Sequence, residues 1–531
     1  MDQPISLTAL ISQLQDLVSK IPNVPSTVPP QPGSDGATAV QRPLLSRSIP
    51  PLPLTSSALP SAGSPLPALL TYLSTHILPH LNASALSPNY YGFVIGGTTP
   101  AALISDFLVA LYDQNVSVHL PSESISTAVE VAALNQLLSL FHLDASTWGI
   151  GPNLPGGGTF TTGATASTVL GLALGREFTL ATAGRRFSAH PPVSVAEEGL
   201  LSAASRAGVH EIRILSALPH SSVLKAAAIL GLGRSSFIDI SRPTSGGLEL
   251  DLTKLETEAS APHRACILVV GAGEVNSGRF ATRGGLAQWQ HLRQICDRLG
   301  VWVHVDGAFG LFARLLADQG SDYDTLVAGA DGLQLADSIT GDGHKMLNVP
   351  YDCGFFFTRH KRLSEQVCLN RAAYLKDGGS GGDGGGDGVQ TPLNVGLENS
   401  RRFRALPVHA TLVAYGREGY VNMVKRQVGL ARRVVRWLWD QDGYEVLPRG
   451  RGEGGVEEAV RETFMIVLFR ARDDVVNDGL VDRVKGDGRI YVSGTVWEGK
   501  KAARIAVSSW MVDVERDGRL IEEALSDALN M

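Results

Sequence analysis

Asp306 stands where a carboxylate can meet a ligand. It ends the β-branched apolar run VWVHVD, and two small residues, Gly307 and Ala308, follow it. A carboxylate at the end of a buried strand needs a cation or hydrogen-bond donors, because an unpaired buried charge is costly. A protonated ring nitrogen would be such a partner, although a structural Asp in a strand-to-helix turn explains the same residues.

Lys345 is the second residue suited to covalent chemistry. It lies in the Gly-flanked segment GDGHKMLNV, 39 residues (345 minus 306) after Asp306. A partly buried lysine amine can form an imine with an aldehyde. A His-Lys pair alone is usually a solvated turn, but a strand-end Asp followed by such a Lys is what a pyridoxal 5'-phosphate (PLP) site requires. There the carboxylate maintains the pyridinium and the lysine holds the aldehyde.

Two further turns could complete such a site. Residues 156–168, GGGTFTTGATAST, place small hydroxyl residues before a helical stretch, where backbone N–H groups and the helix dipole favour a phosphate. A Ser/Thr-rich helix cap explains them equally well. His220, in LPHSSVLKAA, could lie flat on an aromatic ring and handle protons near neutral pH, or be an incidental residue of a capping region.

The elements that must position these residues alternate between short apolar runs and helical stretches across residues 159–360. That alternation favours an α/β fold with a mainly parallel sheet covered by helices, whose active site lies at the carboxyl ends of the strands. Beyond it, residues 400–440 look helical, and FMIVLFR, RIYVSGTV and ARIAVSSW predict strands of a smaller C-terminal α+β domain. The expected division is an N-terminal helix and Pro/Ser-rich linker (1–66), a helical segment (67–150) to which the family resemblance described below assigns dimerisation, a large cofactor-binding domain (151–375), a Gly-rich mobile loop (376–398) and a small domain (399–531).

Composition excludes several classes of function. A formal charge of -6 shows no basic excess of the kind that suits nucleic acid. The four cysteines form no CxxC pair, which suggests neither a zinc site nor disulfides and predicts no bound metal. No uninterrupted run of about 18 apolar residues occurs and no basic leader precedes an apolar run, so we expect a cytoplasmic protein without a membrane span.

Taken in order, the motifs resemble those of the group II PLP-dependent amino-acid decarboxylases. The resemblance is carried by TTGATAST, LPHSSVLKAA, GAGEVNSGRF, HVDGAFG and ADSITGDGHKMLNVPYDCG, and it extends from NYYGFVIGG at 89–97 to the terminal ARIAVSSWMV. It implies the fold type I of PLP-dependent transferases (aspartate aminotransferase-like), PLP as cofactor and a homodimer with sites at the subunit interface.

The same resemblance implies a role for each matching residue. Lys345 would bond the cofactor aldehyde, Asp306 would bind the pyridine nitrogen, and Ala308 and His220 would pack on the two faces of the ring. The remaining cofactor-binding residues would be Ala164 and Thr165 at the phosphate, with His344 and Asp342. Tyr374, in AAYLKDG, matches a mobile-loop tyrosine that protonates the substrate carbon.

The sequence departs from the family pattern at Met346, Gly307, Glu274 and Val275, which weakens any transfer of substrate identity. Tyr91 and Phe93 lie where the family builds part of its substrate pocket and favour an aromatic, tyrosine-like amino acid as the small-molecule substrate.

Other readings remain open. An aromatic aldehyde synthase or another PLP carbon-skeleton enzyme would share the cofactor site. A glutamate-type decarboxylase would need an arginine clamp, for which Arg401, Arg402 and Arg404 are available. A catalytically silent PLP-fold binding protein would lack activity, and a nicotinamide dehydrogenase would need a phosphate-binding GxGxxG at a first strand, which this sequence lacks.

Overall fold

The computed structural model describes residues 7–19, 50, 59, 61–187, 192–243, 248–370, 389–448 and 455–530. Its larger sheet has seven strands in the order β2-β8-β7-β6-β5-β3-β4. The pairs from β4 through β7 are parallel, whereas β8 runs antiparallel to both β7 and β2. The mainly parallel sheet that the sequence predicts is therefore confirmed. The strands are β2 (Gly157–Thr161), β3 (Glu211–Ser216), β4 (Phe237–Asp239), β5 (Arg264–Gly271), β6 (Trp302–Asp306), β7 (Ser338–Asp342) and β8 (Gly354–Thr358).

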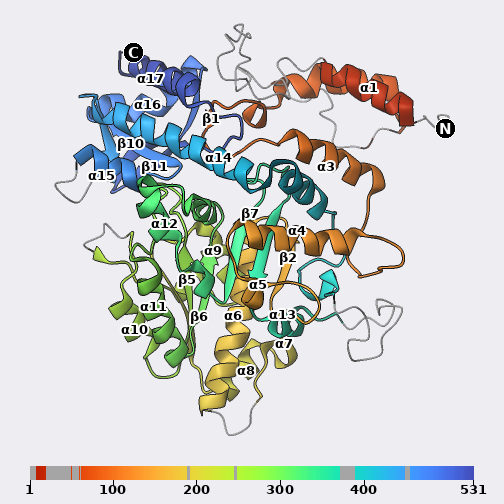
Figure 1. Cartoon of the computed structure of the whole chain (residues 1–531), viewed down its shortest axis with the longest axis vertical. Coiled ribbons are helices and arrows are strands. Elements are labelled where there is room, and N and C mark those ends of the chain that lie inside the picture. The colour runs from red at the N-terminus through yellow and green to blue at the C-terminus, as the bar shows by residue number, and fades with distance from the viewer. Residues whose placement is uncertain are drawn as a thin grey trace.

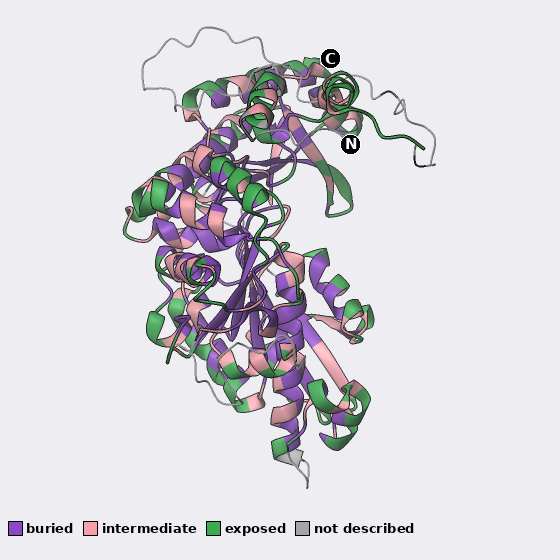
Figure 2. Cartoon of the chain, turned by 90° about the vertical axis from the view of Figure 1, so that its right-hand side faces the viewer, coloured by how far each residue is buried: buried purple, intermediate pink, exposed green. Residues whose placement is uncertain are grey.

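Helices cover both faces of this sheet, and the strands between them are buried (Figure 2). In β5, Ile267 and Val269 pack with α6 and α9 on one face, while Leu268 and Val270 pack with helices of the opposite face. This two-sided burial explains why β5 is a continuous apolar run rather than an alternating one. One layer contains α6 (Ala164–Phe187), α9 (Ser221–Ile229) and α13 (Lys361–Cys368), and the other contains α4 (Ser126–Leu140), α10 (Leu252–Ala259), α11 (Gly285–Leu299) and α12 (Asp324–Ala330).

The C-terminal domain is built on a second sheet of order β1-β11-β12-β10-β9. Three of its strands fall on the apolar runs that the sequence predicts as strands. The strand β1, however, comes from the segment 67–150 and pairs in parallel with β11, so that segment completes the C-terminal sheet as well as supplying helices. The elements are β1 (Tyr90–Tyr91), β9 (Tyr444–Leu447), β10 (Ile466–Ala471), β11 (Tyr491–Trp497), β12 (Lys500–Ala506), α15 (Gly455–Glu462), α16 (Asp474–Asp487) and α17 (Val514–Asn530).

The long helix α14 (Ala405–Trp439) joins the two domains (Figure 1). Its first part packs in the core of the large domain, and its last two turns pack in the core of the C-terminal domain. A kink at Gly416, whose φ is 57°, separates helical segments within it. The remaining described helices include α1 (Leu7–Ser19), α2 (Leu66–Tyr72), α3 (Pro100–Tyr112), α5 (Ala145–Trp148), α7 (Val195–Glu198) and α8 (Leu200–Arg206). Within the described ranges, no helix is both long and apolar enough to cross a lipid bilayer.

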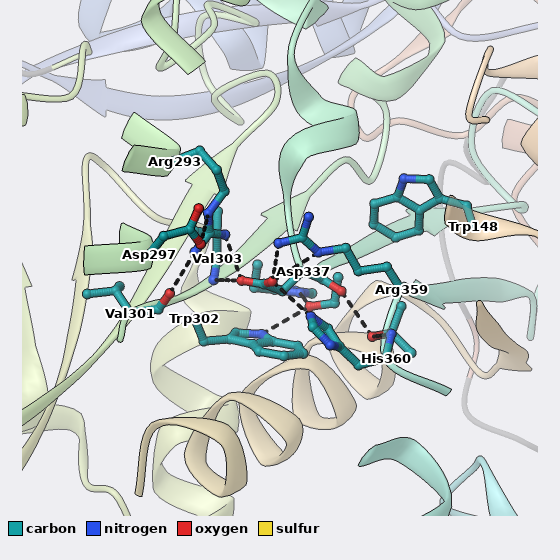
Figure 3. Close-up of polar contacts among 12 residues, drawn as sticks. Trp148, Arg293, Asp297, Val301, Trp302, Val303, Asp337, Arg359 and His360 are labelled. Carbon is teal, nitrogen blue, oxygen red and sulfur yellow. Dashed lines mark hydrogen bonds and ion pairs between the residues drawn. The ribbon is translucent and has the colours of Figure 1, made fainter. Parts of the chain in front are cut away.

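A buried carboxylate ties the strands together at the amino end of β7 (Figure 3). Asp337, which is 1% exposed, accepts hydrogen bonds through Oδ2 from Val303 N (2.8 Å) and from Arg293 Nη1 (2.9 Å). Through Oδ1 it accepts from Arg359 Nη2 (2.7 Å) and Nε (3.1 Å) and contacts His360 Nε2 at 2.9 Å. Burial alone would raise the pKa of Asp337, but His360, Arg293 and Arg359 outweigh it and hold that pKa well below its usual range.

Candidate active site

A cavity of about 580 Å³ opens at the carboxyl ends of the parallel strands. Its wall includes the last residues of four neighbouring strands: Ser216 of β3, Gly271 of β5, Asp306 of β6 and Asp342 of β7. Because the carboxyl ends of parallel strands meet at one edge of the sheet, this is where such folds bind their ligands.

Asp306 lines this cavity, and one of its two carboxylate oxygens has no hydrogen-bond partner among the described residues. Its Oδ1 accepts a hydrogen bond from Ala308 N at 3.2 Å, and no described residue is recorded as a partner of Oδ2. In the sheet, Asp306 is paired with Gly271 on one side and Thr340 on the other, which holds its position at the strand end. The free oxygen is an acceptor for a cationic N–H of a ligand.

Lys345 reaches the same cavity from the turn after β7. Its Nζ lies 2.9 Å from Asp342 Oδ2 and 5.8 Å from the centre of the Phe309 ring. Asp342 is itself 3% exposed, and its Oδ1 accepts a hydrogen bond from Ala164 N, the first residue of α6, at 2.6 Å. Asp342 therefore links the lysine amine to the amino terminus of that helix.

The residue before the lysine is held on two sides. His344 donates from N to Cys353 O (3.1 Å), and its Nδ1 lies 2.8 Å from the same oxygen, so Nδ1 carries the proton. The ring stacks on Tyr351 with centroids 4.6 Å apart. Burial lowers the pKa of His344, which favours the neutral imidazole.

The start of α6 forms the end of the cavity suited to a phosphate. Residues 162–166 line it, including Ala164 and Thr165. The first backbone N–H groups of a helix have no acceptor within the helix and attract anions. Asp342 accepts from one of these groups and Ser167 N donates to Gly163 O, which leaves the amides of Thr165 and Ala166 for a ligand.

His220 and Ala308 both line the cavity as well. The His220 ring caps α9: its Nδ1 accepts from Ser222 N at 3.2 Å and lies 2.8 Å from Ser222 Oγ. With Nδ1 as an acceptor, the neutral ring carries its proton on Nε2.

The donor set therefore fits a phosphorylated pyridine aldehyde. It provides an amine, an acceptor for a ring N–H, an anion-binding helix end and two residues suited to the faces of a ring. A scan of family models matches residues 51–450 to the pyridoxal-dependent decarboxylase conserved domain. The chain belongs to the pyridoxal-dependent decarboxylases. It is accordingly a PLP-dependent amino-acid decarboxylase, and PLP is its cofactor.

Curated relatives of this decarboxylase act on different amino acids. The chain is 24% identical over 493 residues to tryptophan decarboxylase 1 of Oryza sativa subsp. japonica, covering 89% of the chain and 86% of that protein. It is 25% identical over 381 residues to L-2,4-diaminobutyrate decarboxylase of Acinetobacter baumannii, covering 70% and 68%. These relatives share the reaction class of decarboxylation and differ in substrate.

Solved structures share the fold over the whole chain. The TDC of Oryza sativa, solved with PLP and tryptamine, superposes with a TM-score of 0.77 at 20% identity and covers 100% of this chain and 99% of that one. The 4-hydroxyphenylacetaldehyde synthase of Rhodiola rosea gives a TM-score of 0.75 at 18% identity and covers 99% of each chain. The fold type I architecture that the resemblance implies is confirmed by these neighbours.

Most residues that the sequence assigned to the cofactor and the substrate line this cavity of the decarboxylase. Phe93 lies on the cavity wall with 61% of its surface exposed. Tyr91, by contrast, is 1% exposed and packs in the core of the C-terminal domain, away from the lining residues. Tyr91 and Phe93 are two residues apart on an extended segment, but a bend after β1 separates their environments. Tyr374 lies outside the described residues.

The structure also brings to the cavity residues that sequence reasoning missed. Arg504, from β12 of the C-terminal domain, is 7% exposed and donates from Nη1 to Val275 O and from Nη2 to Gly92 O, both at 2.8 Å. Its Nε is buried without a partner among the described residues, and burial lowers the pKa of its guanidinium. The available signal was a single arginine inside the apolar run ARIAVSSW, since a charge within a buried strand has to be paired.

Two other charged residues that line the cavity, Glu274 and Arg279, already have hydrogen-bond or ion-pair partners. Glu274 accepts four hydrogen bonds within its own turn, from the backbone and side chains of Asn276 and Ser277. Arg279 forms an ion pair with Glu462 of the C-terminal domain. The other lining residues outside the predicted cofactor set are largely apolar: Phe93, Val94, Leu218, Leu248, Val275 and Phe309, with Tyr351.

Proposed function

We propose that this enzyme decarboxylates an L-amino acid with an aromatic side chain to the corresponding amine and CO2. The observation that carries the proposal is the largely apolar and aromatic lining of the cavity that contains Lys345 and Asp306. An aromatic side chain buries about 150–250 Å² of surface, and contact with apolar and aromatic residues makes that burial favourable.

The residues that line the cavity would bind PLP and keep its ring nitrogen protonated. PLP supplies the electron sink for the pair of electrons that remains on the substrate's Cα when CO2 leaves. Asp306, through its free oxygen, keeps the proton on the ring nitrogen. His220 and Ala308, which both line the cavity, would hold the ring, and Ala164 and Thr165 would bind the phosphate at the start of α6.

Protonation of Cα completes the reaction. We assign the donor hydroxyl to Tyr374, with His220 Nε2 as a relay, on the basis of the resemblance of AAYLKDG to the family's loop motif. General acid catalysis of this kind is typically worth about 10² to 10⁴ in rate. The Nε2 proton on His220 inferred from its Nδ1 contacts is consistent with a relay.

An acidic substrate is the second candidate, and one atom favours it. The Nε of Arg504 is a buried donor in the cavity wall without a described partner, and a distal carboxylate would satisfy it. Two observations weigh against an acidic substrate. Both terminal nitrogens of Arg504 donate to backbone carbonyl oxygens, and Arg279 is paired with Glu462.

The experiment that tests the proposal is incubation of the purified holoenzyme with each of the twenty L-amino acids. CO2 and amine are followed by mass spectrometry, and ammonia and hydrogen peroxide are followed in parallel. Aromatic amino acids should give amine and CO2. Turnover confined to aspartate or glutamate would replace the aromatic proposal with the acidic one, and an aldehyde with ammonia and peroxide would make the enzyme an aldehyde synthase.

We also propose that the enzyme works as a homodimer. Helix α3 presents a stripe of exposed apolar side chains at helical spacing, Ile104, Phe107, Leu108 and Leu111, and Tyr112 extends it. An exposed apolar stripe of this kind marks an interaction surface, and a second copy of the chain would cover it. Sedimentation of the wild type and of an Ile104→Glu variant tests this: the wild type should sediment as a dimer, and the variant should shift toward the monomer.

A cytoplasmic location is part of the same proposal. None of the cysteines is in a disulfide: Cys266, Cys296 and Cys353 are buried, and Cys368 is partly buried. Free thiols are typical of a reducing compartment, and fractionation of cells expressing the tagged chain would test the location.

A further inference from the structure

Asn348 lies three residues after Lys345 in an unusual backbone conformation. Its φ is 58°, in the left-handed region, and the residue is completely buried. Asparagine tolerates this region better than other residues with side chains, although glycine adopts it most easily. A buried side chain at such a position indicates that the amide makes contacts that compensate for the strain.

The side-chain amide of Asn348 lies among three carbonyl oxygens from distant parts of the chain. Its Nδ2 is 2.8 Å from Gly96 O, 3.0 Å from Ser508 O and 3.3 Å from Lys345 O. Three acceptors require a donor between them, so the amide can be oriented only with its nitrogen toward them. One NH₂ group thus connects the lysine turn, the N-terminal segment and the C-terminal domain.

The neighbouring contacts strengthen this junction. Asn348 N donates to Lys345 O at 3.3 Å, and Thr99 N donates to Asn348 O at 2.9 Å. Only glycine fits at position 96, because a Cβ there would overlap both the Asn348 amide and the main chain of Lys345. Gly96 follows closely after Phe93 and Val94, which line the cavity. The junction therefore sets the lysine turn against the cavity wall.

We propose that Asn348 is a positioning residue, whose side-chain amide fixes the main chain of Lys345 so that Nζ is held where it bonds the cofactor. It touches neither substrate nor cofactor in this role. The inference rests on the proposed assignment of Lys345 as the cofactor-bearing residue.

The test replaces Asn348 by glycine, which adopts the left-handed backbone readily and removes the side chain with its amide. Affinities of the full-length cofactor-free chain are measured for PLP, which bonds the lysine, and for pyridoxamine 5'-phosphate, which has the same ring and phosphate but no aldehyde. Asn348→Gly should weaken PLP binding about 10-fold or more, since the Nδ2 contacts that join Lys345 O to Gly96 O and Ser508 O are lost. Its affinity for pyridoxamine 5'-phosphate should change less than about 2-fold. Equal weakening of both ligands, or no weakening of PLP, would overturn the proposal.

Asn153 provides the matched control. It also has a left-handed backbone, with a φ of 57°, but it is exposed in a turn. Asn153→Gly should leave both affinities unchanged, which shows that the asparagine-to-glycine exchange in this backbone conformation has no effect of its own.

Two further variants separate the possible failures. In a Lys345→Ala background, adding Asn348→Gly should cause no further loss of PLP affinity, because the coupling acts through the lysine; a further loss there would overturn the proposal. If Lys345→Ala alone leaves PLP affinity unchanged, the lysine assignment fails, and the role of Asn348 falls with it. If Asn348→Gly does not fold, Gly96→Ala disturbs the same junction from the other side and should show the same selective loss of PLP binding.

Discussion

Replacing Asp337 with asparagine should destabilise the large domain by several kcal/mol. The carboxylate is 1% exposed and is the shared acceptor for Arg293, Arg359 and His360, as well as for Val303 N of β6. An asparagine keeps the shape but replaces one acceptor oxygen by an NH₂ group that faces donors. Breaking a buried ion pair on one side typically costs ~3–5 kcal/mol, because the partner charge is left buried without compensation.

Asp297, a second carboxylate partner of Arg293, provides an internal control. Arg293 Nε also pairs with Asp297 Oδ1 at 2.9 Å, but the Asp297 side chain is 64% exposed. An exposed pair contributes ~0–1 kcal/mol, so Asp297→Asn removes the same formal charge from the same partner at small cost. The contrast between the two variants isolates the effect of burial.

The assay is thermal unfolding followed by circular dichroism and by tryptophan emission. Trp302 is fully buried against His360, with ring centroids 5.1 Å apart, and is one of the seven tryptophans that contribute to the emission. In thermal unfolding, a loss of ~3–5 kcal/mol in a domain of this size corresponds to a fall of ~6–10 °C in the midpoint, at ~2 °C per kcal/mol. If Asp337→Asn shifts the midpoint no more than Asp297→Asn does, the argument from buried charge is refuted.

The effect should also depend on pH in one direction. The folded-state pKa of Asp337 is lowered, so its contribution to stability is complete above the unfolded-state value of about 4 and is lost as the pH falls below it. The difference between wild type and Asp337→Asn should therefore shrink as the solution is acidified below about pH 4. A difference that stays unchanged as the pH falls from 5 to 2 would contradict the lowered pKa of Asp337.

Three predictions concern the site itself. Lys345→Ala should lose the visible absorbance of the bound cofactor and the pyridoxyl label after borohydride reduction; a label that persists elsewhere on the chain would refute the lysine assignment. Asp306→Asn should retain PLP but decarboxylate about 10- to 100-fold more slowly, because one charge-assisted hydrogen bond of ~1.5–3 kcal/mol is lost; an unchanged kcat would contradict a role at the ring nitrogen. Phe93→Ala should raise KM for an aromatic substrate about 10-fold and leave PLP affinity unchanged, since an aromatic contact contributes ~0.5–1.5 kcal/mol beyond burial; equal KM values in both enzymes would place the substrate elsewhere.

Sequence patterns were informative where the chemistry is local. A β-branched run that ends in a carboxylate predicts both the strand β6 and the position of Asp306 at its carboxyl end, because burial and strand formation depend on neighbouring residues. The Gly-flanked His344–Lys345 pair and the small hydroxyl residues before α6 are likewise short segments. The parallel sheet then brings these separate strand ends to one edge, as the α/β alternation predicts.

Tyr91 and Phe93 mark the limit of that approach. Both are aromatic residues of one short segment, yet one packs in the C-terminal core and the other lies on the cavity wall. The outcome depends on β1 pairing with β11, some 400 residues later in the chain. Composition and spacing carry no information about such a distant pairing.

By itself, then, the sequence determined the class of fold and the cofactor and predicted residues that the structure places around one cavity, since each follows from a contiguous motif or a periodic pattern. Only the tertiary structure decided that Arg504 reaches the cavity from β12. The same holds for the contacts of Asp337 with Arg293, Arg359 and His360. It also holds for the contacts of Asn348 with Gly96 and Ser508 beside the lysine turn. The physical reason is that a buried polar group must find partners wherever the fold places them, and those partners are distant in the chain.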